Sequence, residues 1–222
     1  MRGMNITSIR HKLTGWLNPF VRLAAKTGIT PNQITFLSFL FGLGAAFCYF
    51  CGAFLIGSIL LAVSGILDLT DGSVARLNNK KSDFGAIIDW IVDKYVDGFV
   101  LFAVGLSVFI AGTPKFMAAT GLPMLFYVAV AGLAVLGSIM NTFIKPVTYA
   151  EIGYSCKEDG KISDPLEGVG FFGRPETMLC LILGGLFGEF IWIAVFIIAV
   201  CTNASAVQRI WYLWRLCGRK KE

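Results

Sequence analysis

The sequence predicts an all-α integral membrane protein with six transmembrane helices and an N-terminal amphipathic interfacial helix. Of its 222 residues, 56% are hydrophobic and only 15% are charged. The hydrophobic residues fall into runs close to the roughly 20 residues that a helix needs to cross a bilayer. Short segments that contain charges, glycine or proline separate these runs, as connections between helices do.

The segment 1–29 has the pattern of a helix that lies on the membrane surface. Apolar residues recur at helical spacing from Ile9 to Leu23, while basic residues such as Arg10 and Arg22 occupy other faces. We therefore expect an amphipathic juxtamembrane helix here, because its apolar side can enter the lipid while its basic side stays at the headgroups.

The six spans follow from the hydrophobic runs, and the first begins at the helix-start signal Thr30-Pro31. They are expected at about 34–50, 53–67, 84–111, 122–144, from 175, and from 190 to 214. A polar connection is expected from Lys145 to Arg174. The predicted domains are therefore the juxtamembrane helix 1–29, one transmembrane domain 30–217 and a basic tail 218–222.

Basic residues predict the orientation. Lysine and arginine gather in the N-terminal arm, the loop 76–81, the connection 145–174 and the tail, whereas the alternate loops carry almost only Lys115. By the positive-inside rule, we expect a multi-pass protein of the cell membrane with both termini in the cytoplasm. The net charge of +5 is then explained by basic residues that interact with anionic lipid headgroups, and no nucleic-acid partner is expected.

An acidic constellation lies between the second and third predicted spans. Asp68 and Asp71 are three residues apart and Asp89 and Asp93 are four apart, so each pair shares one helix face. Four carboxylates at membrane depth would cost several kcal/mol each unless cations neutralised them. Oxygen ligands favour Mg²⁺ or Mn²⁺ over zinc, and four carboxylates suit two ions. Asp97, one turn further, is expected to accept hydrogen bonds behind the ligands.

Small residues and an arginine accompany these acids. Gly72, Ala75 and Gly85 expose backbone, which would let a phosphate ligand approach, and Arg76 offers a planar fork for phosphate oxygens. Each glycine taken alone is equally compatible with close packing of membrane helices.

The order of these residues resembles the signature of the CDP-alcohol phosphatidyltransferases. That signature reads Asp-x-x-Asp-Gly-x-x-Ala-Arg, eight residues, then Gly-x-x-x-Asp-x-x-x-Asp. Its fixed positions are all filled, by Asp68, Asp71, Gly72, Ala75, Arg76, Gly85, Asp89 and Asp93. The start of the first span, with Pro31, Asn32 and Thr35, also resembles the family's Pro-Asn-x-x-Thr pattern.

The resemblance implies a six-span homodimer that transfers a phosphatidyl-type or archaetidyl-type group from a CDP-lipid to a small polar alcohol and releases CMP. It implies that two Mg²⁺ or Mn²⁺ ions are bound by Asp68, Asp71, Asp89 and Asp93, and that Asp93 is also the catalytic base. The residues implied to adjoin the CDP group are Asn32, Thr35, Gly72, Ala75, Arg76 and Gly85.

The acceptor alcohol is less determined by the sequence. Lys145, Arg174 and Arg209 are expected to bind the phosphate of a phosphorylated polyol, such as glycerol phosphate or inositol phosphate. Thr177 and Val147 stand where inositol-phosphate members usually carry basic residues, and the motif segments look more like archaeal-type members.

Two alternatives remain open. One is a related enzyme with an unphosphorylated acceptor such as serine or inositol. The other is a divalent-cation transporter, which would need acids along a path through both halves of the membrane.

Overall fold

The computed structural model describes residues 21, 28–78, 82–112, 121–153, 155–156, 162–163, 165–166 and 168–218. The predicted amphipathic helix of residues 1–29 and the predicted basic tail of residues 218–222 lie almost wholly outside the described residues.

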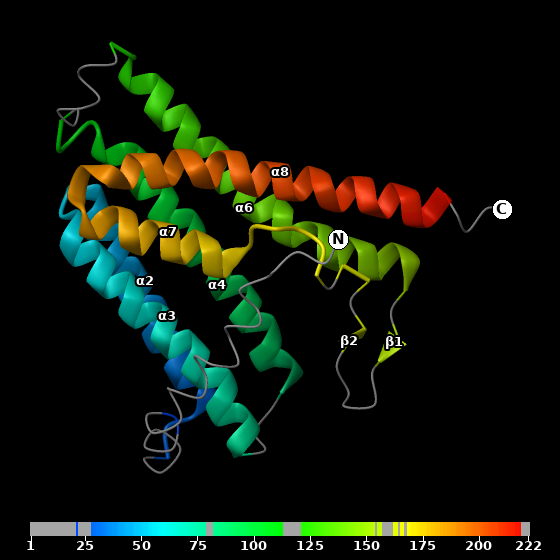
Figure 1. The fold of residues 1–222 in the computed structure, drawn as a ribbon. Helices are drawn as coiled ribbons and strands as arrows, with labels where there is room; N and C mark the ends of the chain where they lie inside the picture. The colour runs from blue at the N-terminus through cyan, green and yellow to red at the C-terminus, as the bar shows by residue number, and fades with distance from the viewer. Residues whose placement is uncertain are drawn as a thin grey trace.

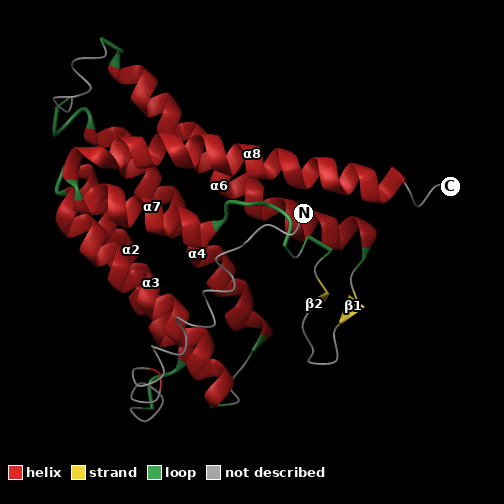
Figure 2. Ribbon diagram, in the orientation of Figure 1, coloured by secondary structure: helices red, strands yellow, loops and turns green. Residues whose placement is uncertain are grey.

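The described residues form six α-helices, which confirms the predicted all-α class (Figures 1 and 2). The helices are α2 (Pro31–Phe50), α3 (Phe54–Leu77), α4 (Asp83–Ser107), α6 (Met124–Ile152), α7 (Arg174–Leu186) and α8 (Ile191–Gly218). A single 3₁₀ turn, η1 (Gly188–Phe190), joins α7 to α8. Two short strands, β1 (Ser155–Cys156) and β2 (Ile162–Ser163), pair antiparallel between α6 and α7.

Within the described part of the chain, four helical segments are long and apolar enough to cross a membrane: α2, α3, α6 and the segment from η1 through α8. The other two differ for separate reasons. Helix α4 has 25 residues but carries Asp89, Asp93, Lys94 and Asp97 along its length. Helix α7 has only 13 residues, fewer than the roughly 20 that a span requires.

Local signals in the sequence explain where three helices begin. Thr30 caps α2 through a reciprocal pair of hydrogen bonds with Gln33. The Ser82 hydroxyl accepts a hydrogen bond from the Gly85 amide (3.0 Å) at the start of α4. At α7, the Glu176 carboxylate accepts a hydrogen bond from the Gly173 amide (2.9 Å). These contacts satisfy amides that a helix leaves without intrahelical partners.

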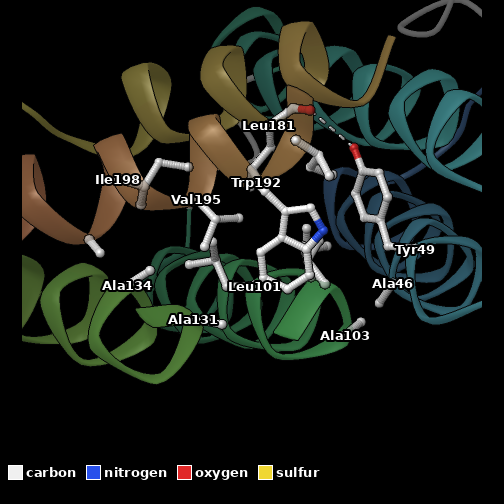
Figure 3. Close-up of a cluster of buried hydrophobic side chains, with 14 of the residues drawn as sticks. Ala46, Tyr49, Leu101, Ala103, Ala131, Ala134, Leu181, Trp192, Val195 and Ile198 are labelled. Atoms are coloured by element: carbon white, nitrogen blue, oxygen red, sulfur yellow. Dashed lines mark hydrogen bonds between the residues drawn. The ribbon is translucent and has the colours of Figure 1, made fainter. Parts of the chain in front are cut away.

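The helices pack around an apolar core in which alanine and valine surround a few large side chains. Helix α2 lies against α3 and α4, α6 lies against α4 and α8, and α7 lies against α3 and α8. Figure 3 shows the centre, where the Tyr49 hydroxyl donates a hydrogen bond to the Leu181 carbonyl and Trp192 lies among small apolar side chains. The Tyr127 and Trp192 rings meet edge to face at 5.4 Å. Through these contacts α7 packs against α2 and against α8, the first and last helices of the bundle.

Helix α6 is longer than the sequence suggested. The predicted span ended at Ile144 with a polar connection from Lys145, but the helix continues through Pro146 to Ile152. Further along, the buried Thr148 hydroxyl donates to the Ile144 carbonyl (2.7 Å), so a polar side chain is accommodated within the helix. Helical continuation places Lys145 on α6 and not in a loop.

Close contact between α6 and α8 yields a stability prediction. A methyl group at Gly137 would meet Thr202 and the Asn203 amide, which donates to the Leu133 carbonyl (3.0 Å), whereas Gly132 on the same helix faces open space. Gly137→Ala should therefore destabilise the fold by about 1–3 kcal/mol, as overpacking does. Gly132→Ala should be neutral or slightly stabilising, because alanine favours helix. Thermal unfolding of the detergent-solubilised variants measures both, and equal midpoints for the two would contradict this packing.

Candidate active site

Four helices converge at one polar site. The second half of α3 carries Asp68 and Asp71, and the first half of α4 carries Asp89 and Asp93. The second turn of α2 and the first residue of α7 bring Thr35 and the Arg174 side chain to these acids, Thr35 to Asp71 and Arg174 to Asp68. In Figure 1 the end of α3 and the beginning of α4 both lie at the lower end of the bundle, which agrees with the six positions that separate Leu77 from Asp83.

Three carboxylates form the centre of the site. Asp68, Asp71 and Asp89 each offer an oxygen atom, and these oxygens all lie within 4.8 Å of one another. Asp71 is buried, with 5% of its surface exposed, and it accepts a hydrogen bond of 2.5 Å from the Thr35 hydroxyl. Thr35 thus fixes the Asp71 carboxylate from a third helix.

This donor set fits a hard divalent cation. The three ligand atoms are carboxylate oxygens gathered from two helices at a spacing that a single ion can bridge. Oxygen ligands favour Mg²⁺, Mn²⁺ or Ca²⁺, and no cysteine or histidine belongs to the group. The triad can therefore hold a metal ion.

Arg174 supplies positive charge at the edge of the triad. Its Nη1 lies 2.8 Å from an Asp68 oxygen and its Nη2 lies 2.7 Å from an Asp93 oxygen. These ion pairs join α7 to α3 and α4, and the Arg174 side chain is only 17% exposed. Asp93 accordingly faces Arg174 in this structure, while Asp68, Asp71 and Asp89 face one another.

A second polar group lies one turn beyond Asp93. Asp97 is 3% exposed, and one of its oxygens is 2.8 Å from the Lys94 ammonium. The same oxygen accepts a hydrogen bond from the Ser138 hydroxyl of α6 (3.3 Å). The other Asp97 oxygen lies 3.6 Å from Nε of Arg174. Asp97 therefore accepts a hydrogen bond behind the predicted ligands, in the manner expected from its place on α4.

The residues implied to adjoin CDP lie on α2, α3 and α4, the first two of which pack against each other and the third against α2. A methyl group added at Gly85 would come within 3.2 Å of the Asn32 side-chain oxygen, so α2 and α4 approach closely there. The exposed Arg76 guanidinium lies near Gly72, on the last turns of α3, and donates to Ser73 (2.9 Å). Ala75 is half-buried beside them.

The three residues expected to bind the acceptor occupy different surroundings. Arg174 contacts the acids directly. Arg209 is buried and binds backbone, with Nε donating to the Val169 carbonyl (3.0 Å) and Nη1 donating to the Asn141 carbonyl. Lys145 is half-buried on α6, one helical turn beyond Asn141. The structure thus joins Arg174 to the carboxylates, and it joins Arg209 to the loop that precedes α7.

Sequence reasoning did not anticipate three of these contacts: the Arg174 ion pairs, the Thr35–Asp71 hydrogen bond and the role of Lys94. Only Lys94 had a readable signal, because a lysine within an apolar run needs a partner and Asp97 stands three residues away. Ser138 and Thr35 had no comparable signal, since their partners are on other helices.

Comparison with known proteins supports the same interpretation. A family model described as CDP-alcohol phosphatidyltransferase matches residues 28–202. The chain is 26% identical to an archaetidylinositol phosphate synthase of Pyrococcus horikoshii over 206 residues, which are 93% of this chain and 95% of that protein. It is 31% identical to a bifunctional IPC transferase and DIPP synthase of Aquifex aeolicus over 85% of this chain, which spans 40% of that protein.

The fold is also similar to solved structures. The crystal structure of the Mycobacterium tuberculosis phosphatidylinositol phosphate synthase with manganese and citrate matches with a TM-score of 0.68 and 21% identity, over 88% of each chain. The same enzyme with CDP-DAG bound matches with a TM-score of 0.67 and 23% identity, over 88% of this chain and 92% of that one. With the family match over most of its length and its carboxylates grouped in space, the chain belongs to the CDP-alcohol phosphatidyltransferase family.

Proposed function

We propose that this protein transfers a phosphatidyl-type or archaetidyl-type group from a CDP-lipid to inositol phosphate and releases CMP. The observation that carries the proposal is the joining of a carboxylate triad with the guanidinium of Arg174. Such a site combines metal ligands with a fork that can bind phosphate. The names of relatives that synthesise archaetidylinositol phosphate or phosphatidylinositol phosphate support this acceptor.

Asp68, Asp71, Asp89 and Asp93 would hold two Mg²⁺ or Mn²⁺ ions. Bound there, the ions would neutralise the diphosphate of the donor and favour attack at phosphorus. Thr35 would keep Asp71 oriented for this task through its short hydrogen bond. The triad geometry supports three of the four ligands directly, and Asp93 would join them by exchanging its contact with Arg174.

The donor would lie beside the carboxylates. Gly72, Ala75 and Gly85 have little or no side chain, so the diphosphate would approach the backbone there, and Arg76 is exposed and free of ion pairs among the described residues. Asn32 lies beside Gly85 and would contact the CDP group together with Thr35. A donor held at the helix ends would keep its lipid chains in the bilayer.

The reaction requires one base. The acceptor hydroxyl oxygen would attack the β-phosphorus, which carries the lipid, and form a new phosphorus–oxygen bond. The bond between that phosphorus and the bridging oxygen would break, and CMP would leave with the bonding electrons. Asp93 would take the hydroxyl proton. Fixing both substrates in line is the main contribution that the chain makes to this step.

The acceptor's phosphate would be bound by Arg174, with Lys145 and Arg209 lining the same side. Arg174 faces the site from α7, which supports a direct role. Thr177 is 1% exposed and its hydroxyl donates to the Gly173 carbonyl (3.0 Å), so this position stabilises the first turn of α7. Binding of the acceptor's phosphate would therefore depend on Arg174, because Thr177 supplies no second positive charge from α7.

The same proposal extends to the membrane arrangement. Helices α4 and α7 would complete six spans: α4 is long enough at about 37 Å to cross the hydrocarbon core, and the 13-residue α7 would be a short span packed against α3 and α8. Residues 1–29 would lie at the interface, 30–217 would form one transmembrane domain, and 218–222 would be a basic tail. Both termini and the active site would face the cytoplasm, and two copies would form a homodimer.

A substrate panel tests the proposed function. Purified protein in detergent would be given a CDP-lipid and, in turn, inositol phosphate, glycerol phosphate, serine and inositol, while CMP release is measured. We expect release with inositol phosphate at the highest kcat/KM. A higher kcat/KM with glycerol phosphate would replace inositol phosphate as the proposed acceptor. A higher kcat/KM with serine or inositol would overturn the proposal that the acceptor is phosphorylated.

Activity should require a divalent cation. We expect Mg²⁺ or Mn²⁺ to support turnover and chelation with EDTA to abolish it, because the grouped carboxylates cannot hold a diphosphate without positive charge. Readdition of Mn²⁺ after chelation should restore the rate, which controls for damage by the chelator. Full turnover in excess EDTA would contradict the metal centre.

Removing a single ligand should impair catalysis strongly. Asp68→Asn, Asp71→Asn or Asp89→Asn should each lower kcat/KM by about a hundredfold or more, since metal ligation contributes several kcal/mol to transition-state stabilisation. Asp83→Asn is the matched control, because Asp83 is exposed in the first turn of α4 and lies outside the triad. A comparable loss at Asp83 would mean that the assigned helix faces are wrong.

Arg174→Ala distinguishes phosphate binding from a structural role. Loss of a charged hydrogen bond of about 1.5 to 3 kcal/mol should raise the KM for inositol phosphate by roughly ten- to hundredfold and leave the KM for CDP-lipid within about twofold. If Arg174 serves only as a counter-ion that holds α7 against the acids, both KM values and the thermal midpoint should change together.

A further inference from the structure

Asp97 joins three helices at a buried position. Its side chain is 3% exposed on α4, and its Oδ2 atom is 2.8 Å from the Lys94 ammonium. The Ser138 hydroxyl of α6 donates to the same Oδ2 atom (3.3 Å), and Lys94 also donates to that hydroxyl (3.3 Å). One oxygen of Asp97 is thus fixed by a closed triangle of polar contacts, because each of the three groups binds the other two.

The second oxygen faces Arg174. Oδ1 of Asp97 lies 3.6 Å from Nε of Arg174, which is buried and makes no hydrogen bond within the described residues. The terminal nitrogens of the guanidinium point elsewhere, Nη1 to Asp68 and Nη2 to Asp93. Asp97 therefore faces the guanidinium from its Nε side, while the other two acids take its terminal nitrogens.

This difference between the three acids becomes important when a metal ion is bound in the site. Asp68 and Asp93 are proposed metal ligands, whereas Asp97 lies one turn beyond Asp93 and is held by Lys94 and Ser138. If Asp68 and Asp93 bind metal, Asp97 is the one carboxylate of the three that stays with Arg174. A buried guanidinium without any anion is strongly unfavourable, so this contact would keep Arg174 in the site.

We propose that Asp97 is a positioning residue for Arg174. Held by Lys94 and Ser138, it would fix the Nε side of the guanidinium and leave Nη1 and Nη2 directed at the acceptor's phosphate, the two-pronged geometry in which arginine binds phosphate best. This inference rests on the proposed function, in which Arg174 binds a phosphorylated acceptor. Asp97 itself touches neither substrate.

A double-mutant cycle tests the coupling, with inositol phosphate as the acceptor probe. Asp97→Asn preserves the size of the side chain and removes its charge. We expect it to raise the acceptor KM by about fivefold or more, while kcat and the KM for CDP-lipid stay within about twofold. In an Arg174→Ala background, Asp97→Asn should cause no further change, because the residue through which it acts is gone.

Two further variants keep the test decisive. Asp83→Asn makes the same chemical change on an exposed position of the same helix and should leave the acceptor KM unchanged. Ser138→Ala removes the hydrogen bond to Asp97 and the one from Lys94 but no charge, so it should shift the acceptor KM in the same direction by a smaller factor. If Asp97→Asn fails to fold, the cycle is run with Ser138→Ala.

Mn²⁺ binding, measured by electron paramagnetic resonance without substrates, separates positioning from ligation. Asp97→Asn should change the Mn²⁺ affinity by less than about threefold, and a tenfold loss would make Asp97 a metal ligand and overturn the inference. Effects of Asp97→Asn and Arg174→Ala that simply add, or equal increases in both KM values, would also overturn it. If the unmodified protein uses no phosphorylated acceptor in the substrate panel, the proposed function is contradicted together with this inference. If the enzyme is active and the effects of the two substitutions add, only the role of Asp97 is contradicted.

Discussion

The structure depends on the need to balance negative charge within a membrane helix bundle. Six aspartates lie on α3 and α4, and two of them, Asp71 and Asp97, are almost fully buried. Ionised carboxylates at such positions are costly unless cations, hydrogen bonds or both compensate them. Within the bundle, the Thr35 hydroxyl donates to Asp71 and the Lys94 ammonium pairs with Asp97. The Arg174 guanidinium pairs with Asp68.

This requirement explains why α7 is placed where it is. Its first residue pairs with acids of α3 and α4, and the segment before it is held by α6 and α8. The Asn141 amide donates to the Phe172 carbonyl (2.6 Å), and Arg209 binds the Val169 carbonyl. Gly170, with φ of +94°, allows the Arg209 guanidinium to approach, because a methyl group there would lie 2.5 Å from Nε. Arg209 thereby orients the loop that delivers Arg174.

The combination of triad and arginine suits transfer to a phosphorylated acceptor. Carboxylates that gather cations and an arginine with a planar fork lie side by side, so a diphosphate and a second phosphate could be bound within one site. The relatives named for inositol phosphate products agree with this arrangement. The preference for archaeal-type members in the motif segments likewise agrees with the archaetidylinositol phosphate synthases among them.

From the sequence alone follow the all-α class, the family, and the placement of Asp68 with Asp71 on one helix face and of Asp89 with Asp93 on another. Helix periodicity is local, so residue spacing predicts which side chains share a face. It was wrong about the end of the fourth helix, since Lys145 and Pro146 looked like a connection but lie within α6. Three contacts became known only from the packed helices: Arg174 meets Asp68 across 106 residues, Ser138 meets Asp97 across 41, and Arg209 binds backbone. These contacts cross between helices, and their partners follow from packing angles and helix order that no local pattern encodes.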